Sequence, residues 1–466
     1  MRVVKKHSII LTEDFKKSIL HWAQQFDEVI WLDSNHHQQD HSKYKAILAV
    51  DAFTAIKTDE FNAFEKLEEY QTKTKDWLFG YLTYDIKNDV ERLSSTNFDG
   101  LQFPDLYFFQ PKKVFLFTED EVEIHYLNFV DDELEADWQE ITHLSKNLHY
   151  FEPDRLCEAG ISNKQKKKEH ESTGLHEEER RSDLMKSDKN PIKIHLRTSK
   201  DSYFEKINSM LQHIHLGDIY EANFCQEFYS ENVSIDPVKT YLHLNDISKS
   251  PFATFLKLGS HFSFSASPER YIKKTGNNVI SQPIKGTAKR HQNKTEDEKL
   301  KSELQKDSKE RSENIMITDL VRNDLSRLAV KGSVNVDELC KVYTFEQVHQ
   351  MITTISCEVK DNISPVSILK NTFPMGSMTG APKISAMKII EKLEDAKRGL
   401  YSGTIGYFTP DGNFDFNVII RSILYNSENK YVSFSVGGAI TAKSIPEKEY
   451  EECLLKAKAM REVLES

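Results

Sequence analysis

The sequence lacks paired cysteines, long apolar runs and an excess of positive charge. Its five cysteines lie far apart among 466 residues and form no Cys-x-x-Cys pair. This excludes a zinc ribbon or a dithiol redox motif, and a sparse, odd cysteine count is typical of a reducing cytoplasm. No run approaches the roughly 20 apolar residues of a membrane-spanning helix, and the charged first residues do not resemble a signal peptide. We therefore expect a cytoplasmic protein with no membrane partner.

The charge balance is acidic, with 62 lysines and arginines against 73 aspartates and glutamates and a formal net charge of −11. Such a chain is a poor general binder of nucleic acid, so no nucleic-acid partner is expected. An anionic ligand would have to be attracted by a local site, such as a metal ion or a few basic residues. Apolar residues make up 38% of the chain, enough for a sizeable core.

Three regions of the chain differ in composition. Residues 1–157 mix helical and strand-like patterns, with residues 77–84 and 113–117 typical of strands. Residues 158–195 are charged and almost free of apolar side chains, which favours a flexible linker or surface insertion. Residues 196–466 carry the strongest patterns, and we expect them to form the functional domain, with the N-terminal region packed against it.

Helical and strand-like patterns are mixed in this larger region. Residues 203–216 have helical spacing, and Gly217 can end that helix. One long helix is predicted over residues 296–328, and a last helix runs from Ser444 and Pro446 to the end of the sequence. Many strands with long helices, and no strict alternation, favour an α+β fold. The predicted strands are residues 219–228, 252–258, 261–265, 403–408, 413–424 and 431–436.

Two pairs of glutamates have a spacing that places both side chains on one side of a helix. Glu310 and Glu313 are three residues apart, as are Glu449 and Glu452. If the pairs face each other, their oxygens suit Mg²⁺, which accepts a few carboxylates and keeps waters for substrate oxygens to replace. By spacing alone, solvated acidic pairs are the ordinary alternative.

Lys285 stands between Ile284 and Gly286, at the end of a strand-like run. A partly buried lysine loses its proton more readily and can act as a nucleophile. We therefore expect a lowered pKa at Lys285 if it reacts, because the attacking amine must be neutral. An ordinary loop lysine is the alternative.

Two other segments are candidates for holding an anion. Residues 413–421 alternate as a strand, which predicts that Arg421 points inward and binds a carboxylate bidentately. A strand that faces the surface is the alternative. Gly437 and Gly438 follow a predicted strand, and adjacent glycines allow backbone N–H groups to approach an anion.

Eight segments stand in a fixed order: Gly217-Asp-Ile-Tyr-Glu-Ala-Asn223, Ser267-Pro-Glu-Arg270, Pro283-Ile-Lys-Gly-Thr287, Glu313-Asn-Ile-Met-Ile-Thr-Asp-Leu-Val-Arg-Asn-Asp324, Phe373-Pro-Met-Gly-Ser-Met-Thr-Gly-Ala-Pro-Lys383, Ser402-Gly-Thr-Ile-Gly-Tyr407, Val418-Ile-Ile-Arg421 and Glu449-Tyr-Glu-Glu452. Together they resemble the chorismate-utilising enzymes, the family of anthranilate synthase component I and aminodeoxychorismate synthase component I. The resemblance spans nearly all of the second half and is fainter in the first. It implies a fold like that of anthranilate synthase component I, with large antiparallel sheets flanked by helices.

The resemblance also implies roles for particular residues. Glu269 falls on the family's general acid, which helps the C4 hydroxyl of chorismate to depart. The family's magnesium ligands correspond to Glu310, Glu313, Glu449 and Glu452. The positions that hold the substrate carboxylates correspond to Thr287, Tyr407, Arg421 and the backbone of Gly437 and Gly438.

Lys285 distinguishes activities within the family. In relatives that resemble aminodeoxychorismate synthase, a lysine at this position attacks C2 of chorismate, and ammonia then enters at C4. The product, 4-amino-4-deoxychorismate, is the precursor of 4-aminobenzoate and folate. The alternatives are anthranilate synthase component I, where this position is typically alanine, and a catalytically silent subunit that binds chorismate.

The sequence departs from the family pattern at three places, one of which is Ala439, the third small residue of the glycine turn. Gln350 stands where a second histidine often follows His349, so that histidine's role cannot be transferred. Glu221 stands where a glutamine is common, and isochorismate-forming relatives have a basic lysine there, whose absence argues against water addition. No segment resembles a glutamine amidotransferase, so the implied nitrogen source is free ammonia or a separate glutaminase chain.

Overall fold

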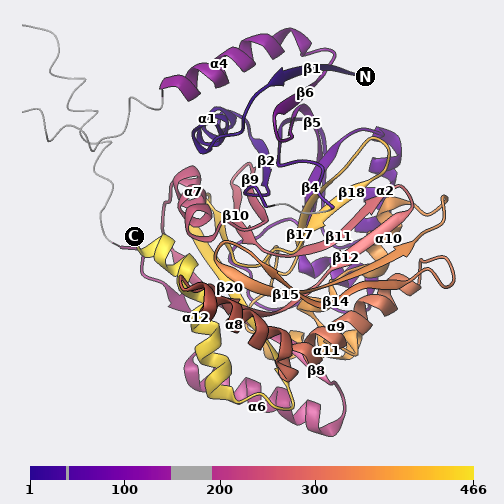
Figure 1. The fold of residues 1–466 in the computed structure, drawn as a ribbon, viewed down its shortest axis with the longest axis vertical. Coiled ribbons are helices and arrows are strands. Elements are labelled where there is room, and N and C mark those ends of the chain that lie inside the picture. Colours follow the sequence, from indigo (N-terminus) through magenta and orange to yellow (C-terminus); the bar gives the residue numbers. More distant parts are fainter. Residues whose placement is uncertain (38–40, 148–190) are drawn as a thin grey trace, which may run out of the picture.

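The computed structural model describes residues 1–37, 41–147 and 191–466, so residues 158–190 of the predicted linker lie outside the described residues. The described strands form one 20-stranded sheet system in which all paired strands are antiparallel, with helices packed on its faces (Figure 1). Among the described helices, none combines the length and apolar character needed to cross a membrane. The α+β class expected from the sequence is confirmed.

The sheet divides into two arms at a central pair of strands, β3 (Ala46–Thr58) and β5 (Leu106–Phe117). One arm runs from β3 through β2 (Glu28–Asp33), β9 (Phe252–Leu258), β10 (His261–Ser267), β19 (Ser422–Asn426), β20 (Tyr431–Thr441) and β8 (Glu221–Glu231) to β16 (Gly380–Ala381). The other runs from β5 through β4 (Leu78–Leu82), β17 (Thr404–Phe408), β18 (Phe414–Asn417), β11 (Arg270–Thr275) and β12 (Asn278–Gln282) to β15 (Val348–Glu358), which pairs with β13 (Ile284–Lys289) and β14 (Asn335–Thr344). Strand β6 (Glu121–Leu127) pairs with β5 and carries β1 (Arg2–Ser8) at its other side, and the short β7 (His195–Leu196) pairs with β8.

The N-terminal region is part of this sheet. Strand β2 pairs with β9, and β4 pairs with β17, so residues 1–157 and 196–466 contribute neighbouring strands. A large apolar core lies between the two arms and includes Ile30, Leu256 and Phe416. The two regions thus share one sheet, and the predicted division of the chain into an N-terminal region, a linker and a larger functional domain stays a prediction.

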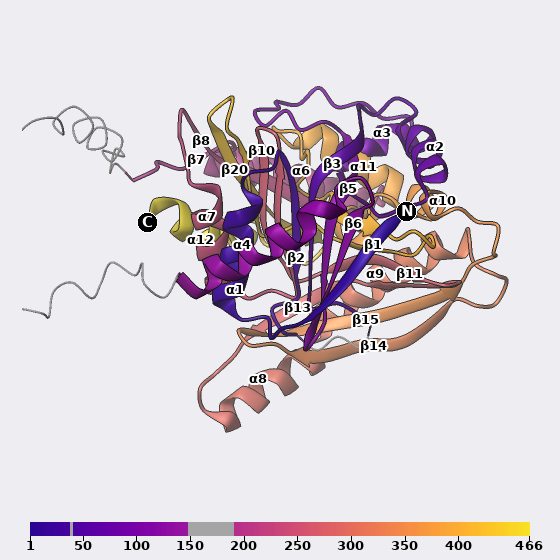
Figure 2. The same ribbon diagram turned by 90° about the horizontal axis from the view of Figure 1, so that it is seen from above.

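Helices cover the outer faces of the sheet. A second core joins α1, α4, α7 and α12 to the adjacent strands, and Figure 2 shows α1 beside α4. Helix α9 packs on β13 and β15. The helices are α1 (Glu13–Ala23), α2 (Ala63–Thr74), α3 (Lys87–Val90), α4 (Leu134–Asn147), α6 (Lys200–Leu216), α7 (Pro237–Ser248), α8 (Lys294–Lys306), α9 (Ser308–Ser326), α10 (Pro365–Thr372), α11 (Lys383–Leu393) and α12 (Pro446–Glu465).

The predicted long helix over residues 296–328 is wrong, because it is two helices. Asp307 lies between α8 and α9, and its side chain accepts hydrogen bonds from the backbone N–H groups of Lys309 and Glu310, at 2.8 and 3.0 Å. This is N-cap geometry, which begins a new helix in the middle of a helical pattern. Glu310 consequently lies in the first turn of α9, where the helix dipole favours a carboxylate.

Candidate active site

Lys285 lies in an irregular part of β13. The pairing of β13 with β15 shifts between Ile284 and Thr287, which leaves Lys285 and Gly286 in a bulge. Gly286 has φ = +86°, and a Cβ atom there would lie 3.1 Å from Glu310 Oε2. Glycine suits this position for two reasons: it adopts a positive φ without strain, and it has no Cβ atom to hinder the close approach of α9.

Carboxylates surround the Lys285 amine. Its Nζ donates a hydrogen bond to Glu221 Oε1 at 3.3 Å, and the two side chains are 12% and 1% exposed. Burial lowers the pKa of Lys285, but Glu221, Glu313 and Glu269 outweigh burial and raise that pKa above its ordinary value. The predicted lowering is therefore wrong: these carboxylates converge only in the folded chain, and they favour the charged lysine.

Glu269 lies between β10 and β11 and is 4% exposed. Burial raises the pKa of its carboxyl to about 7, although the positive charges of Lys285 and Arg421 oppose the shift. A buried carboxyl that keeps its proton near neutral pH is suited to donate it to a departing hydroxyl. This environment agrees with what the proposed general acid requires.

The raised pKa of Glu269 predicts a pH-dependent loss of stability. The folded state favours the protonated carboxyl, so this contribution is complete below about pH 4.5 and is lost as the pH rises through about 7. Between pH 5 and pH 8 we expect the wild type to lose up to about 3 kcal/mol of unfolding free energy relative to Glu269→Gln. Urea unfolding of both proteins at both pH values measures this, and an unchanged difference would contradict it.

Arg421 reaches the site through a turn. The predicted strand over residues 413–424 is wrong, because β18 ends at Asn417 and β19 begins at Ser422. Arg421 itself has φ = +51°, a conformation that non-glycine residues rarely adopt. The turn is held to the Glu269 loop, since Val418 N–H donates to Glu269 O at 3.0 Å and Ala266 N–H donates to Arg421 O at 3.1 Å. These bonds keep the guanidinium close enough to Glu269 for the two charges to interact.

The glycine pair lies within β20, whereas the sequence places it after a strand. Gly437 and Gly438 pair with Cys225 and Phe224 of β8. A Cβ atom on Gly437 would lie 2.4 Å from the sulfur of Cys225, so close packing alone excludes a larger residue. A Cβ on Gly438 would lie 3.6 Å from Glu449 Oε2, which places the pair beside the carboxylates of α12.

The four predicted magnesium ligands lie on the first turns of α9 and α12, and their charges affect one another's pKa values. Burial, together with the carboxylates of Glu310 and Glu221, raises the pKa of Glu313 to about 7. Burial and neighbouring carboxylates, including Glu452, also raise the pKa values of Glu310 and Glu449. The exposed Glu452 differs, because Lys456 outweighs burial and lowers its pKa. The charges of the two pairs therefore act on each other, as facing pairs would.

Within the described residues, no three acidic, histidine or cysteine side chains converge into a ready metal site. Lysine ammonium groups neutralise part of the charge instead, with Lys309 Nζ 3.7 Å from Glu313 Oε1 and Lys456 Nζ 2.7 Å from Glu452 Oε1. Glu313 Oε1 is nevertheless buried and has no hydrogen-bond partner in the described structure. A set of carboxylate oxygens with an unsatisfied buried member fits a hard cation such as Mg²⁺.

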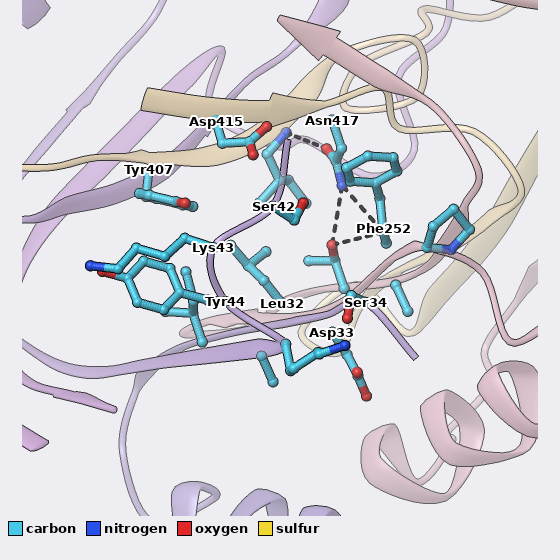
Figure 3. A pocket seen from close by; sticks show the side chains of 17 residues that line it. Leu32, Asp33, Ser34, Ser42, Lys43, Tyr44, Phe252, Tyr407, Asp415 and Asn417 are labelled. Atoms are coloured by element: carbon cyan, nitrogen blue, oxygen red, sulfur yellow. Dashed lines mark hydrogen bonds between the residues drawn. The ribbon is translucent and has the colours of Figure 1, made fainter. Parts of the chain in front are cut away.

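The two other predicted substrate-binding residues, Thr287 and Tyr407, have different surroundings. Thr287 is exposed on β13, opposite Gln350, two residues beyond Lys285. Tyr407 lies on β17 and lines a different cavity of about 70 Å³ together with Lys43, Tyr44 and Asn417 (Figure 3). Its ring packs on Trp77 and Phe79. The structure therefore does not bring Tyr407 together with Lys285 and Glu269.

Another tyrosine, Tyr401, lies beside the glycine pair and was not selected from the sequence. The sulfur of Cys225 donates to its hydroxyl at 3.6 Å, and Cys225 is the partner of Gly437 across the sheet. Tyr401 precedes β17, whereas Tyr407 lies within it. Both tyrosines lie close to the Ser402-Gly403 turn in the sequence. The pairing of strands determines which of them lies beside the glycine pair.

His349 is buried and links two elements of the fold through its ring nitrogens. It is fully buried on β15, and its ring nitrogens lie 3.0 Å from Thr344 Oγ1 and 3.1 Å from Asp297 Oδ1. Asp297 also accepts hydrogen bonds from the guanidinium of Arg290. These contacts tie α8 to β15 and give His349 a packing role next to Gln350.

Comparison with known proteins adds sequence and structural relatives. Residues 9–462 match the family described as chorismate binding enzyme. The chain is 41% identical over 264 residues to the aminodeoxychorismate synthase of Arabidopsis thaliana, named as chloroplastic, a match of 56% of this chain but only 28% of that protein. It is 32% identical over 407 residues to an anthranilate synthase component I-like protein of Synechocystis, covering 87% of this chain and 76% of the relative. The chloroplastic relative leaves the compartment of this chain a prediction.

The fold is also that of a solved relative. Anthranilate synthase component I of Streptococcus pneumoniae superimposes with a TM-score of 0.71 at 23% identity, over 91% of this chain and 93% of that one. The anthranilate synthase component I-like fold expected from the sequence is thus confirmed. Since the family match spans both arms of the sheet and the glutamate, lysine and arginine cluster between them, the chain belongs to the chorismate binding enzyme family.

Proposed function

We propose that the chain is component I of an aminodeoxychorismate synthase, which uses ammonia to convert chorismate into 4-amino-4-deoxychorismate. The observation that carries this proposal is a largely buried lysine, Lys285, whose charge acts on a buried acid, Glu269, with a pKa raised to about 7. The name of the Arabidopsis relative, the more similar of the two at 41% identity, supports the same activity.

The proposed reaction uses two covalent steps. Lys285 first transfers a proton to the carboxylate of Glu269. Its neutral amine then attacks C2 of chorismate, the ring double bond shifts, and the C4 hydroxyl takes that proton from Glu269 and leaves as water. Ammonia then attacks C4, the double bond shifts back, and the bond from C2 to Lys285 breaks. Arg421 offers a bidentate partner for a substrate carboxylate, and the backbone beside Gly437 and Gly438 offers space for it.

Magnesium is the proposed cofactor. Glu310, Glu313, Glu449 and Glu452 would hold it, and the bound ion would offset the negative charge of the chorismate dianion. The buried oxygen of Glu313 that accepts no hydrogen bond in the described structure supports this assignment. With Arg421, it would supply local positive charge in an acidic protein.

Anthranilate synthase component I is the competing function, favoured by the name of the Synechocystis relative that matches over 87% of this chain. Both reactions consume chorismate and ammonia, so only the product separates them. The test is to incubate the pure protein with chorismate, Mg²⁺ and ammonium and to identify the product by mass and fluorescence. Aminodeoxychorismate supports the proposal, whereas fluorescent anthranilate would support the competing function. The absence of turnover would support a silent, chorismate-binding subunit.

The nitrogen source gives a separate prediction. Since no segment of this sequence resembles a glutaminase, we propose that a glutamine amidotransferase supplies its ammonia. We expect the isolated protein to use ammonium, increasingly well at alkaline pH because the free base is the nucleophile, and not to use glutamine. Product formation is measured with each nitrogen source over pH 7 to 9. Glutamine-dependent product from the purified chain alone would refute the prediction.

A further inference from the structure

Glu221 is a buried carboxylate at the centre of the site, held by backbone on both sides. It begins β8, where it pairs with Ala381 of β16 and Thr441 of β20. The approach of β16 is close: a Cβ atom on Gly380 would lie 2.1 Å from the Glu221 carbonyl oxygen. With 1% of its surface exposed, the residue cannot turn its charge toward solvent.

The two carboxylate oxygens of Glu221 have different surroundings. Oε1 accepts a hydrogen bond from Lys285 Nζ at 3.3 Å, whereas Oε2 is buried and has no partner among the described residues. The charged groups that interact with Lys285 include Glu221 of β8, Glu313 of α9, Glu269 of the β10–β11 loop and Glu452 of α12. An unpaired buried carboxylate oxygen is costly unless it receives a donor, so Oε2 of Glu221 favours a ligand that can donate a hydrogen bond to it.

We propose that Glu221 positions the incoming nitrogen substrate, with Oε1 holding Lys285 and the unpaired Oε2 accepting a hydrogen bond from ammonium. The proposal rests on the proposed amination of chorismate. Ammonium fits because it is a small cation with donors only, so it satisfies the free oxygen without bringing another acceptor into an acidic pocket. A glutamine at this position would supply one acceptor oxygen but no charge.

The nitrogen step balances when Glu221 carries a proton between two amines. Ammonium gives a proton to the Glu221 carboxylate and becomes ammonia, whose lone pair forms the bond to C4. The adduct nitrogen is a secondary ammonium, and when its bond to C2 breaks Lys285 leaves as a neutral amine. That amine takes the proton back from Glu221, so the products are the aminodeoxychorismate ammonium group, charged Lys285 and the original carboxylate.

The experiment compares wild type, Glu221→Gln and Glu221→Asp, with Glu231→Gln as the control at the exposed end of the same strand. For each protein the KM for ammonium chloride and the KM for chorismate are measured with saturating Mg²⁺, from pH 7 to 9. Intact-protein mass spectrometry without ammonium reports the adduct on Lys285. Glutamine keeps the shape and one acceptor for Lys285, so Glu221→Gln tests the charge.

We expect Glu221→Gln to raise the KM for ammonium about tenfold or more, in keeping with the loss of a charge-assisted hydrogen bond, while the adduct still forms and the KM for chorismate changes little. Glu221→Asp should fall between wild type and Glu221→Gln, and the control should match wild type. An unchanged ammonium KM in Glu221→Gln, or equal effects on ammonium, chorismate and adduct, would overturn the role. Failure of the wild type to form aminodeoxychorismate would instead overturn the proposed function beneath it.

Discussion

Replacing Lys285 by arginine is expected to reduce the rate of aminodeoxychorismate formation by about 100-fold to 10,000-fold, the range for a positioned group that acts in the transition state. Arginine keeps a positive charge for Glu221, Glu313 and Glu269, but its guanidinium does not deprotonate and cannot attack C2. Lys285→Ala should lose the covalent route as well. Some amination can survive in either variant, because direct attack by ammonia at C2, the course expected for an anthranilate synthase, needs no lysine.

The two variants separate chemistry from stability. Lys285→Ala leaves Glu221 buried without its cation, which should cost about 3–5 kcal/mol of unfolding free energy, whereas Lys285→Arg retains the pair. Product formation and thermal unfolding are measured for both. If Lys285→Arg forms aminodeoxychorismate as fast as the wild type, Lys285 is not the nucleophile and the choice between the two synthases reopens.

Replacing Glu313 by glutamine is expected to abolish magnesium-dependent turnover, with a loss of at least about 100-fold at low Mg²⁺. The reason is that a catalytic metal contributes several kcal/mol of transition-state stabilisation, and each 1.4 kcal/mol is about tenfold in rate. The loss of activity should not be accompanied by a loss of stability in the metal-free protein. Because Glu313 Oε1 is buried without a hydrogen-bond partner, Glu313→Gln should be as stable as wild type, or more so, without Mg²⁺.

The measurements are turnover against Mg²⁺ concentration, Mg²⁺ binding by calorimetry and thermal unfolding with and without the metal. Glu452→Gln should also weaken the Mg²⁺ dependence, although Glu452 is more exposed and already pairs with Lys456. Glu303→Gln on the exposed surface of α8 is the matched control. Near-normal activity of both Glu313→Gln and Glu452→Gln at low Mg²⁺ would remove these glutamates from the metal site.

Local signals in the sequence predicted several elements well. Helix α6 ends where Gly217 adopts φ = +84°, and α12 begins at Pro446, because glycine and proline act on their own backbone. The spacing of three between Glu310 and Glu313 is also a local signal, because residues three apart in a helix point to the same side. The break at Asp307 has a local cause as well, since an aspartate within a helical pattern can act as the N-cap of a new helix.

Features set by distant segments could not be predicted in this way. The pKa of Lys285 depends on Glu221 and Glu313, which come from another strand and a helix, so sequence neighbours suggested the wrong direction. The surroundings of Tyr407 also depend on distant segments, since its ring packs on Trp77 and Phe79, whereas Tyr401 lies beside Cys225, the partner of Gly437. The motifs and their order could be read from the sequence, whereas their spatial neighbours and the resulting pKa shifts depend on the fold.

The most direct test of the proposed lysine chemistry is the mass of the intact protein after mixing with chorismate and Mg²⁺ in the absence of ammonium. The wild type should gain the mass of chorismate less one water, and peptide mapping should place the addition on Lys285. Lys285→Arg should gain nothing, and adding ammonium to the wild type should remove the adduct and release aminodeoxychorismate. An unmodified wild type that still forms product, or an adduct that persists in Lys285→Arg, would contradict the account.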